Sequence, residues 1–564
     1  PAATVAVPPT AIPATATPVV VEKLKLSTEL KALFARYPQQ MKWYADPGIP
    51  ASQPRYGGTF VGGRTANIPH WDPKIAIAGV GGGAGACYGG LLRSSFDFVT
   101  GGMVTPIPRP DAAESWRLVD ERTWEFKLNP NVYWHDRAPV NGRRVTAEDL
   151  KWNIESYKAN SVYSGSFQII SEVTVKDPST LIVKTSEPYS LLPALLAGAG
   201  VQFTAPEMEQ QPGGTKTWCI GFGPYMVTDY APNEDWVAKR HPKYHLKGHT
   251  GMQLPYLDGL FASKISDSAA AYAGFISGRL HHQTVGASTS LIEKVLKECP
   301  ACPGLMHPIA GAEVHLAMRL DKAPFNDIRV RRALSMGQDR AAILKTAYEN
   351  AGYISMQIPM DALGWDTPPL LEERGKYLQF NLPEAKRLLA EAGYSNGFTS
   401  SVITASSLAG ANLAALEQLV FQWKQNLNVD VKITPKESLS AAQAAQSKTY
   451  DNMIWLSTVT PGTNWDSASY MAMYSKSANN LYFINDPEVD KAAVAVRTTF
   501  DPAKQREALK KLFDLGDENI YRLDLVNPMY FTILSPRLEN TGPSLYTFIF
   551  SWGSRSFESS WFKQ

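Results

Sequence analysis

The segment from Arg122 to Trp152 constrains the fold more than any other part of the chain. Its pattern predicts a strand, a tight polar turn, a short aromatic strand, a glycine-bearing turn and then a helix. Thr146 is the expected N-cap of that helix, because a threonine hydroxyl accepts from the free amides of the first turn. Glu148 and Asp149 lie in that turn, where the helix dipole favours negative charge. This order of elements is unusual as a local pattern.

The size and charge of the chain exclude several classes of protein. A chain of 564 residues is too long for one core, so we expect two or more domains. The formal net charge of +2 provides no basic field, so we expect no nucleic-acid partner. The sequence contains no run of about 18 apolar residues, so we expect no membrane-spanning helix.

The four cysteines permit two disulfides in an oxidising compartment. Cys87 and Cys219 stand alone, whereas Cys299 and Cys302 have the CxxC spacing that also occurs in redox and zinc motifs. A zinc site would need two more ligands, and only His307 lies near in sequence. We therefore favour a local structural disulfide or free thiols at the CxxC, and the connectivity stays open.

Motifs for catalysis or metal binding are weak in this chain. The sequence has no GxSxG, HExxH or Walker pattern, so we expect no enzyme, no catalytic residue and no cofactor. His241, His245 and His249 recur every four residues, but neighbouring prolines and glycines predict a loop there, so we expect no metal site. His281 and His282 follow a predicted helix end and are expected at the surface.

The pattern changes character near Leu320. Before it, strand–turn–strand patterns dominate, and the globular body is predicted to begin at Tyr56. After it, helices alternate with strands, which indicates α/β architecture. The strand–turn–strand units are expected at 113–128, 173–188 and 221–244. The helices are expected near 24–36, at 269–280, at 327–348 with Asp327 as N-cap, at 382–394 and at 413–427.

Short blocks from Tyr56 onward carry a family resemblance. They include YGGTF at 56–60, HWDP at 70–73, CYGGLL at 87–92, GFGPY at 221–225, PYLDGL at 255–260 and PFNDIRVRRALSMGQDRAAI at 324–343. On these blocks and the segment 122–152, the chain resembles the family 5 solute-binding proteins, the dipeptide/oligopeptide-binding components of ABC transporters. No single block is decisive, but this many in the right order do not arise by chance.

The resemblance implies an α/β fold of the periplasmic-binding-protein type, class II or cluster C. Two lobes would be joined by two hinge strands, with an extra domain on the first lobe. The implied boundaries are 55–95, 218–318 and 528–564 for lobe 1, 96–217 for the extra domain and 319–527 for lobe 2. Crossings near Arg319 and Asn527 would absorb the rotation that closes the lobes.

The resemblance also implies a function. The protein would be the extracytoplasmic substrate-binding protein of an ABC importer, a monomer that captures a peptide by lobe closure and delivers it to the membrane permease. One alternative keeps this role with an oligosaccharide or another neutral solute. Another class of alternative is a peptide-holding chaperone or an enzyme on the same fold, since fold does not dictate function.

The amino terminus suits a location outside the cytoplasm. Residues 1–21 consist of Pro, Ala, Thr and Val with one Ile, so the segment 1–25 is predicted to be an extended tether. The chain begins without Met, which suggests a removed signal segment or trimming. A tether before a globular body suits a lipoprotein, so we expect a lipid anchor. The alternative is a disordered tail without function.

Two groups of residues are expected to bind the ligand: the main chain at 77–79 and the polar side chains of His315 and Arg319. By resemblance, the main chain of Ile77, Ala78 and Gly79 grips the ligand, and a mobile surface loop is the alternative. His315 and Arg319 are polar groups on an otherwise apolar strand and share one face by two-residue spacing. Buried polar groups need partners, so either a ligand or a core contact must satisfy them.

The segment 455–471 is expected to discriminate between ligands. Peptide-binding members of the family have an Asp there that pairs with the α-ammonium of the ligand. Thr458 or Thr460 occupies the matching position, and the nearest carboxylate, Asp466, comes several residues later. This difference puts recognition of a peptide terminus in doubt.

Aromatic and neutral polar side chains remain in the same region. Trp455 and Trp465 offer flat faces, and Asn479 offers a neutral amide, which would suit a sugar at least as well as a peptide. The alternative for both tryptophans is core packing.

Overall fold

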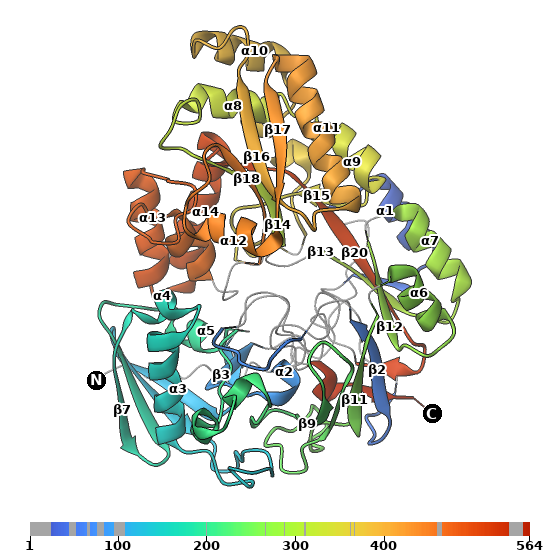
Figure 1. Ribbon diagram of the computed structural model, residues 1–564, viewed down its shortest axis with the longest axis vertical. Helices are drawn as coiled ribbons and strands as arrows, with labels where there is room; N and C mark the ends of the chain where they lie inside the picture. Colours follow the sequence, from blue (N-terminus) through green and yellow to red (C-terminus); the bar gives the residue numbers. More distant parts are fainter. Residues whose placement is uncertain are drawn as a thin grey trace.

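The computed structural model shows the predicted α/β fold, with two lobes joined by strands that cross between them (Figure 1). It describes residues 24–43, 52–64, 68–75, 84–94, 108–198, 200–265, 267–286, 288–308, 312–360, 362–365, 367–459, 465–540 and 556–563. Most of the predicted tether lies outside these residues, so the tether stays a prediction. No helix in the described ranges is long and apolar enough to cross a membrane.

Two sheets form the first lobe, in the orders β1-β13-β20-β12 and β2-β11-β10-β9. Helices α1 (Thr28–Arg36), α2 (Ala84–Cys87), α6 (Ser268–Ile276) and α7 (Thr289–Glu298) accompany them. The strands of the first sheet are β1 (Met41–Trp43), β12 (His282–Val285), β13 (Gly304–Pro308) and β20 (Val526–Leu534). Those of the second are β2 (Thr59–Arg64), β9 (Tyr225–Tyr230), β10 (Trp236–Arg240) and β11 (Gly259–Lys264). Two small pairs, β3 (Leu92–Ser94) with β4 (Pro108–Pro110) and β21 (Leu538–Glu539) with β22 (Trp561–Phe562), complete it.

The extra domain is an antiparallel sheet covered by a helix. The strand order is β5-β6-β8-β7, and helix α3 (Ala147–Asn160) packs against β7 and β8. Short helices α4 (Ser164–Phe167) and α5 (Leu192–Leu196) follow along the chain. The strands are β5 (Ala113–Asp120), β6 (Thr123–Leu128), β7 (Ile170–Asp177) and β8 (Thr180–Thr185). The predicted hairpins at 113–128 and 173–188 are therefore confirmed.

The second lobe is built on a mixed sheet with the order β17-β16-β18-β14-β19. Its strands are β14 (Ala312–Met318), β16 (Thr399–Ala405), β17 (Asp430–Lys436), β18 (Met453–Val459) and β19 (Arg522–Asp524). Its helices are α8 (Ile328–Met336), α9 (Arg340–Tyr348), α10 (Leu382–Glu391), α11 (Gly410–Leu427), α12 (Ser438–Gln446), α13 (Pro487–Thr498) and α14 (Pro502–Asn519). These helices surround the sheet at the top of Figure 1.

Two strand crossings connect the lobes. The first runs from β13 to β14, and the second runs from β19 into β20. Strand β20 changes partner along its length: residues 526–528 pair with β15 (Gly352–Ile354), and residues 529–534 pair with β13 and β12. One strand is thus shared between the two lobes. Asn527 lies where the pairing changes, while the residue boundaries predicted for the domains stay predictions.

Several local predictions are confirmed, and some are wrong. Thr146 caps α3 through a capping box, in which its hydroxyl accepts from Asp149 N and its own N–H donates to the Asp149 carboxylate at 2.9 Å. The prediction of a short aromatic strand is wrong. Tyr133 makes only an isolated bridge to Arg144, and the chain between them turns at Asn141 and Gly142.

The helix predicted over 327–348 is two helices rather than one. Asp327 caps α8 as expected, but Gly337 ends that helix and Asp339 caps α9. A Cβ on Gly337 would lie 2.5 Å from Leu427, so the glycine allows the close approach of α11. His282 is also buried rather than at the surface, because β12 pairs with the core strand β20.

The described part of the chain already contains a packed segment from Leu24 to Trp43, before Tyr56, where we predicted that the globular body begins. Helix α1 (Thr28–Arg36) and strand β1 pack on the first lobe, where β1 pairs with β13 and Arg36 pairs with Glu293 of α7. The same segment reaches the second lobe, since Glu29 accepts from Asn350 at 2.8 Å. The helix predicted near 24–36 is confirmed, but its packing was missed, because the partners α7 and β13 lie more than 250 residues away along the chain.

We expect Leu30→Ala to destabilise the folded body. Leu30 is fully buried, and truncating a buried leucine costs about 2–5 kcal/mol. Urea unfolding followed by circular dichroism measures the loss. Thr28→Ala, at an exposed position of the same helix, serves as the control, and equal stability of the two variants would show that α1 does not pack as described.

Candidate functional site

The predicted ligand-binding residues are only partly covered by the structure. Ile77, Ala78, Gly79 and Thr460 lie outside the described residues, so their role stays a prediction. Thr458 lies in β18, where its backbone is paired with Glu313 of β14. The remaining residues are placed, and they do not form one cluster.

His315 lies in β14, and Arg319 directly follows the last residue of that strand. His315 is fully buried and accepts from the Tyr482 hydroxyl through Nε2 at 2.9 Å, while Nδ1 donates to the Glu313 carbonyl at 2.8 Å. The Arg319 guanidinium lies 4.1 Å from the ring centre of Phe483. Both side chains therefore contact the 482–483 segment.

Protein groups already satisfy both polar side chains. Burial and the nearby Arg522 guanidinium lower the pKa of His315, so its imidazole is neutral. Arg319 forms a bidentate pair with Asp321, at 2.7 and 2.6 Å, and donates to the Tyr450 carbonyl. These contacts favour the core alternative for His315 over a direct ligand contact.

Trp455 lies on the opposite face of the sheet from His315. In the β14–β18 ladder, Trp455 is paired with Leu316 and His315 is paired with Leu456. Directly paired residues point to the same face, so Trp455 shares the face of Leu316. Its side chain is 7% exposed within the core. Trp455 and His315 therefore cannot line the same surface of this sheet.

Asp466 is part of a buried ion pair. Its carboxylate accepts from Arg497 at 3.0 and 2.8 Å and from the Tyr189 hydroxyl at 3.0 Å. The residue is 1% exposed. Asp466 directly precedes the π-helical turn η6 (Ser467–Met471). In that turn, the ring centre of Tyr470 lies 3.6 Å from the Arg497 guanidinium. Asn479, in contrast, is exposed.

Trp465 differs from the other predicted ligand residues in having a buried polar atom without a hydrogen-bond partner among the described residues. This atom is the indole nitrogen, and the ring is half-buried. Irregular helical turns such as the neighbouring η6 occur frequently at functional sites. Both features are compatible with a role in ligand binding.

A buried polar cluster sits where the strands cross between the lobes. The Glu313 carboxylate accepts from Met356 N at 2.9 Å, from the Asn527 amide at 2.7 Å and from the Tyr353 hydroxyl at 3.1 Å. The Asn527 side-chain oxygen accepts from Val314 N at 2.8 Å. The cluster thereby ties β14, β15 and β20 together. Burial raises the pKa of Glu313 to about 7, although these hydrogen bonds oppose the shift.

Sequence reasoning missed this cluster. A signal was present, because Glu313 is two residues before His315 on the same apolar strand and meets the same spacing test. The partners could not be found, since Tyr353 and Asn527 come from segments 40 and 214 residues away along the chain.

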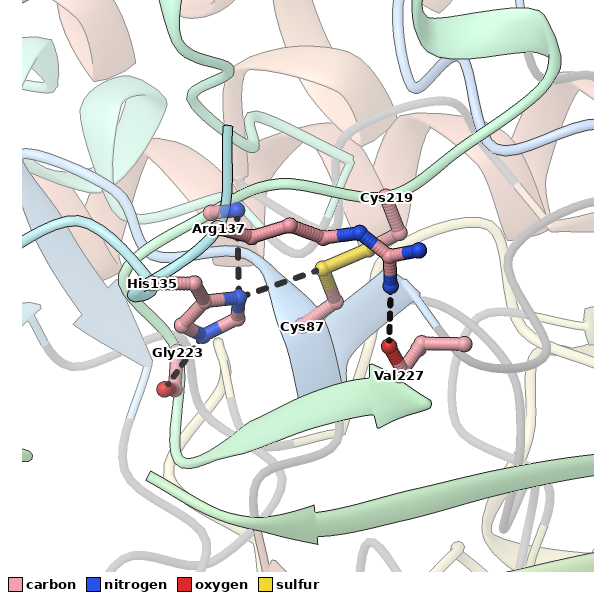
Figure 2. The surroundings of a disulfide bond; sticks show 7 residues. Cys87, His135, Arg137, Cys219, Gly223 and Val227 are labelled. Carbon is pink, nitrogen blue, oxygen red and sulfur yellow. Dashed lines mark hydrogen bonds between the residues drawn. A yellow bond between two sulfur atoms is a disulfide. The ribbon is translucent and has the colours of Figure 1, made fainter. Parts of the chain in front are cut away.

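A disulfide fixes the chain just after the predicted Ile77–Gly79 contact (Figure 2). Cys87 is bonded to Cys219, and Cys299 to Cys302, so of the two alternatives left open at the CxxC the structure shows the local disulfide. Figure 2 shows His135 beside the Cys87 sulfur, with Nε2 donating to the Gly223 carbonyl at 3.1 Å. Burial lowers the pKa of His135 to about 4, so this histidine is neutral.

Two family blocks pack against each other at this disulfide. A Cβ on Gly221 would lie 2.2 Å from the Cys87 carbonyl oxygen, and one on Gly223 would lie 2.6 Å from it. The GFGPY block therefore needs its glycines to approach the CYGGLL block. Among the described residues, no group of three or more His, Cys, Asp or Glu side chains could hold a metal.

The family assignment follows from a family model that matches the middle of the chain. The model of the bacterial extracellular solute-binding proteins, family 5 Middle, matches residues 108–481, which span the extra domain and most of the second lobe. The chain belongs to this family. Membership places the protein outside the cytoplasm as a solute-binding protein.

Individual relatives and solved structures agree with this assignment. The periplasmic oligopeptide-binding protein OppA of Escherichia coli (strain K12) is 27% identical over 478 residues, 76% of this chain and 79% of that protein. The structure of DppA from Helicobacter pylori in complex with the peptide STSA has a TM-score of 0.73 and 18% identity, covering 90% of this chain and 99% of that one. AgaA from A. tumefaciens R10, in complex with agropinic acid, has a TM-score of 0.72 and 19% identity, with coverage of 90% and 99%.

We expect Glu313→Gln to flatten part of the pH dependence of stability. The folded-state pKa of about 7 lies above the ordinary 4.5, so the protonated group stabilises the fold below pH 4.5. That contribution is lost as the pH rises to about 7. Melting temperatures between pH 5 and 8 should therefore fall less steeply for Glu313→Gln than for the wild type.

Glu507→Gln, at an exposed position of the second lobe, is the matched control and should follow the wild-type slope. A Glu313→Gln curve parallel to the wild type would show that Glu313 titrates as an ordinary carboxylate.

Proposed function

We propose that the protein captures a peptide outside the cytoplasm and delivers it to the permease of an ABC importer. The observation that carries the proposal is the family match over residues 108–481. The relative named as an oligopeptide-binding protein and the structural neighbour bound to a peptide support the choice of solute. The partner is then a membrane permease, and the solute-binding protein acts as a monomer.

Capture requires movement of one lobe against the other. The first lobe carries the extra domain, and the second lobe is linked to it through β13–β14 and β19–β20. A rotation about these crossings opens and closes the space between the lobes. A ligand that contacts both lobes binds the closed form better and shifts the population towards it. The closed shape is what the permease would recognise, and no chemical step is needed.

Peptide recognition in this chain does not use Asp466 for the α-ammonium group. Withdrawing Asp466 from Arg497, which is only 8% exposed, would leave this buried guanidinium with only the exposed Glu187 carboxylate, at 3.3 Å. Breaking such a pair costs about 3–5 kcal/mol. Recognition through the main chain of Ile77, Ala78 and Gly79 and through aromatic faces such as Trp465 avoids this cost.

The same observation keeps a neutral solute as a second candidate. A site whose nearby carboxylate is already paired has no free counter-charge for an ammonium group, which suits an oligosaccharide. The structural neighbour in complex with agropinic acid is a case of a non-peptide ligand on the same fold. The lipid anchor expected from the predicted tether is part of the proposal and has no bearing on this choice.

We expect a ligand-stripped preparation to release or absorb heat with a pool of di- to pentapeptides. Isothermal titration calorimetry against that pool, and against a pool of cello- and xylo-oligosaccharides, decides between the solutes. Submicromolar peptide affinity supports the proposal, and heat from the sugar pool alone overturns the peptide assignment. Broad weak binding to unfolded chains would indicate a chaperone, and turnover of a bound compound would indicate an enzyme.

A further inference from the structure

The extra domain touches the second lobe through the turn at residues 187–190, and also through Ser166, which lies 3.2 Å from the Met471 sulfur, and through the rings of Trp124 and Phe500. Residues 187–190 follow β8 and lie against α13 and η6 of the second lobe. In Figure 1 the end of the extra domain near α4 reaches the lower end of α13. The side chains at this contact are charged and polar, and most of them are buried.

Tyr189 makes the central contact. Its hydroxyl donates to the Asp466 carboxylate at 3.0 Å, and the Arg497 guanidinium that pairs with Asp466 lies 5.2 Å from the Tyr189 ring centre. Tyr189 is fully buried, and Asp466 is 1% exposed. Glu187 pairs with the outer side of Arg497 at 3.3 Å. Burial and the neighbouring Asp466 raise the pKa of Tyr189, so the phenol keeps its proton as a donor.

Ser190 completes the contact at a helix end. Its backbone N–H and its hydroxyl both donate to the Arg497 carbonyl, at 2.9 and 3.0 Å. Arg497 lies in the last turn of α13, where helix carbonyls have no partner within the helix. Gln505 of α14 donates to the Ser190 hydroxyl at 3.0 Å. The turn therefore supplies hydrogen-bond donors that the second lobe lacks by itself.

The turn and its partners belong to parts that move relative to each other. The extra domain is tied to the first lobe, because Gly89 is bridged to Phe203 and Ala113 N donates to the Leu91 carbonyl. Asp466 and Arg497 belong to the second lobe. In Figure 1 the contact near α4 and α13 lies well apart from β14 and β20, so a rotation about those strands separates Tyr189 from Asp466.

We propose that residues 187–190 form an interlobe latch that stabilises the closed form and thereby sets how tightly the ligand is held. This inference rests on the proposed function, because it assumes that the two lobes close around the ligand. Opening exposes the Tyr189 hydroxyl, Asp466 and the carbonyl end of α13 to water. Closing exchanges these water contacts for the bonds to Tyr189 and Ser190, whose partners Asp466, Arg497 and Gln505 are buried. Tyr189 is thus a positioning residue and does not itself contact the ligand.

The test compares Tyr189→Phe with the wild type. The substitution removes the hydroxyl and keeps the ring, so Asp466 retains its pair with Arg497. Hydrogen exchange of the Ser190 amide, which donates across the contact, reports whether the latch is closed. We expect this amide to exchange about tenfold faster in Tyr189→Phe than in the wild type, both with and without the di- to pentapeptide pool. The affinity for the same pool should fall by about tenfold.

Tyr157→Phe is the matched control. Tyr157 is also fully buried in the extra domain, but its hydroxyl bonds to the carbonyls of Gly200 and Gln202 within that domain. It should leave the Ser190 amide at the wild-type rate. Ser190→Ala provides a second variant of the latch, since it removes the hydroxyl donor to Arg497 and leaves the Tyr189 contact intact. It should weaken peptide binding in the same direction.

The outcomes separate the latch from the proposed function. The latch is overturned if the wild type and Tyr189→Phe bind peptide with equal affinity and their Ser190 amides exchange at equal rates. That result leaves the proposed function standing. Faster Ser190 exchange in Tyr189→Phe without any effect of peptides supports the latch and overturns the peptide assignment. A Ser190 amide that exchanges at the rate of a free peptide in every condition shows that the contact does not form, which also overturns the latch.

Discussion

Both lobes depend on the way one strand, β20, divides its hydrogen bonds between them. Residues 526–528 extend the second lobe by pairing with β15, and residues 529–534 form the middle of the first-lobe sheet between β13 and β12. A one-residue slip of β20 would change its register with β15 as well as with β13 and β12. Such a slip would also move every side chain of the strand to the other face of the sheet. One continuous strand thus takes part in both lobes, and its change of partner next to Asn527 is one of the two places where we expect the lobes to turn.

The polar groups around this crossing keep it specific. Asn527 and Glu313 satisfy one another and the adjacent main chain, and Arg374 joins Asp517 and Asp524 behind them at 2.7 and 3.1 Å. Unpaired charges at such depth would be strongly destabilising, so the network holds only when all its members are in place. On the opposite side, the contact of Tyr189 with Asp466 closes the lobes through side chains that separate when the lobes move apart. The molecule thus combines a fixed crossing with a reversible contact.

Local features were predictable from the sequence, because their causes lie within a few residues. The caps Thr146 and Asp327 and the hairpin of β7 and β8 follow from residue types at short spacing. The family resemblance supplied the two-lobe arrangement, which composition and periodicity alone do not reveal. The buried contact of Asp466 could not be predicted from the sequence, because its partner Tyr189 is 277 residues away along the chain. The packing of α1 and β1 was missed for the same reason, since α1 contacts α7 and β1 pairs with β13, both far along the chain.

Small-angle X-ray scattering of the wild-type protein, with and without the di- to pentapeptide pool, tests the central claim of closure on a ligand most directly. Closure on a ligand predicts that saturation with peptide lowers the radius of gyration and yields a scattering profile that fits the arrangement of the lobes in Figure 1. A profile that stays unchanged while calorimetry shows peptide bound would contradict the account, because the ligand would then be held without movement of the lobes.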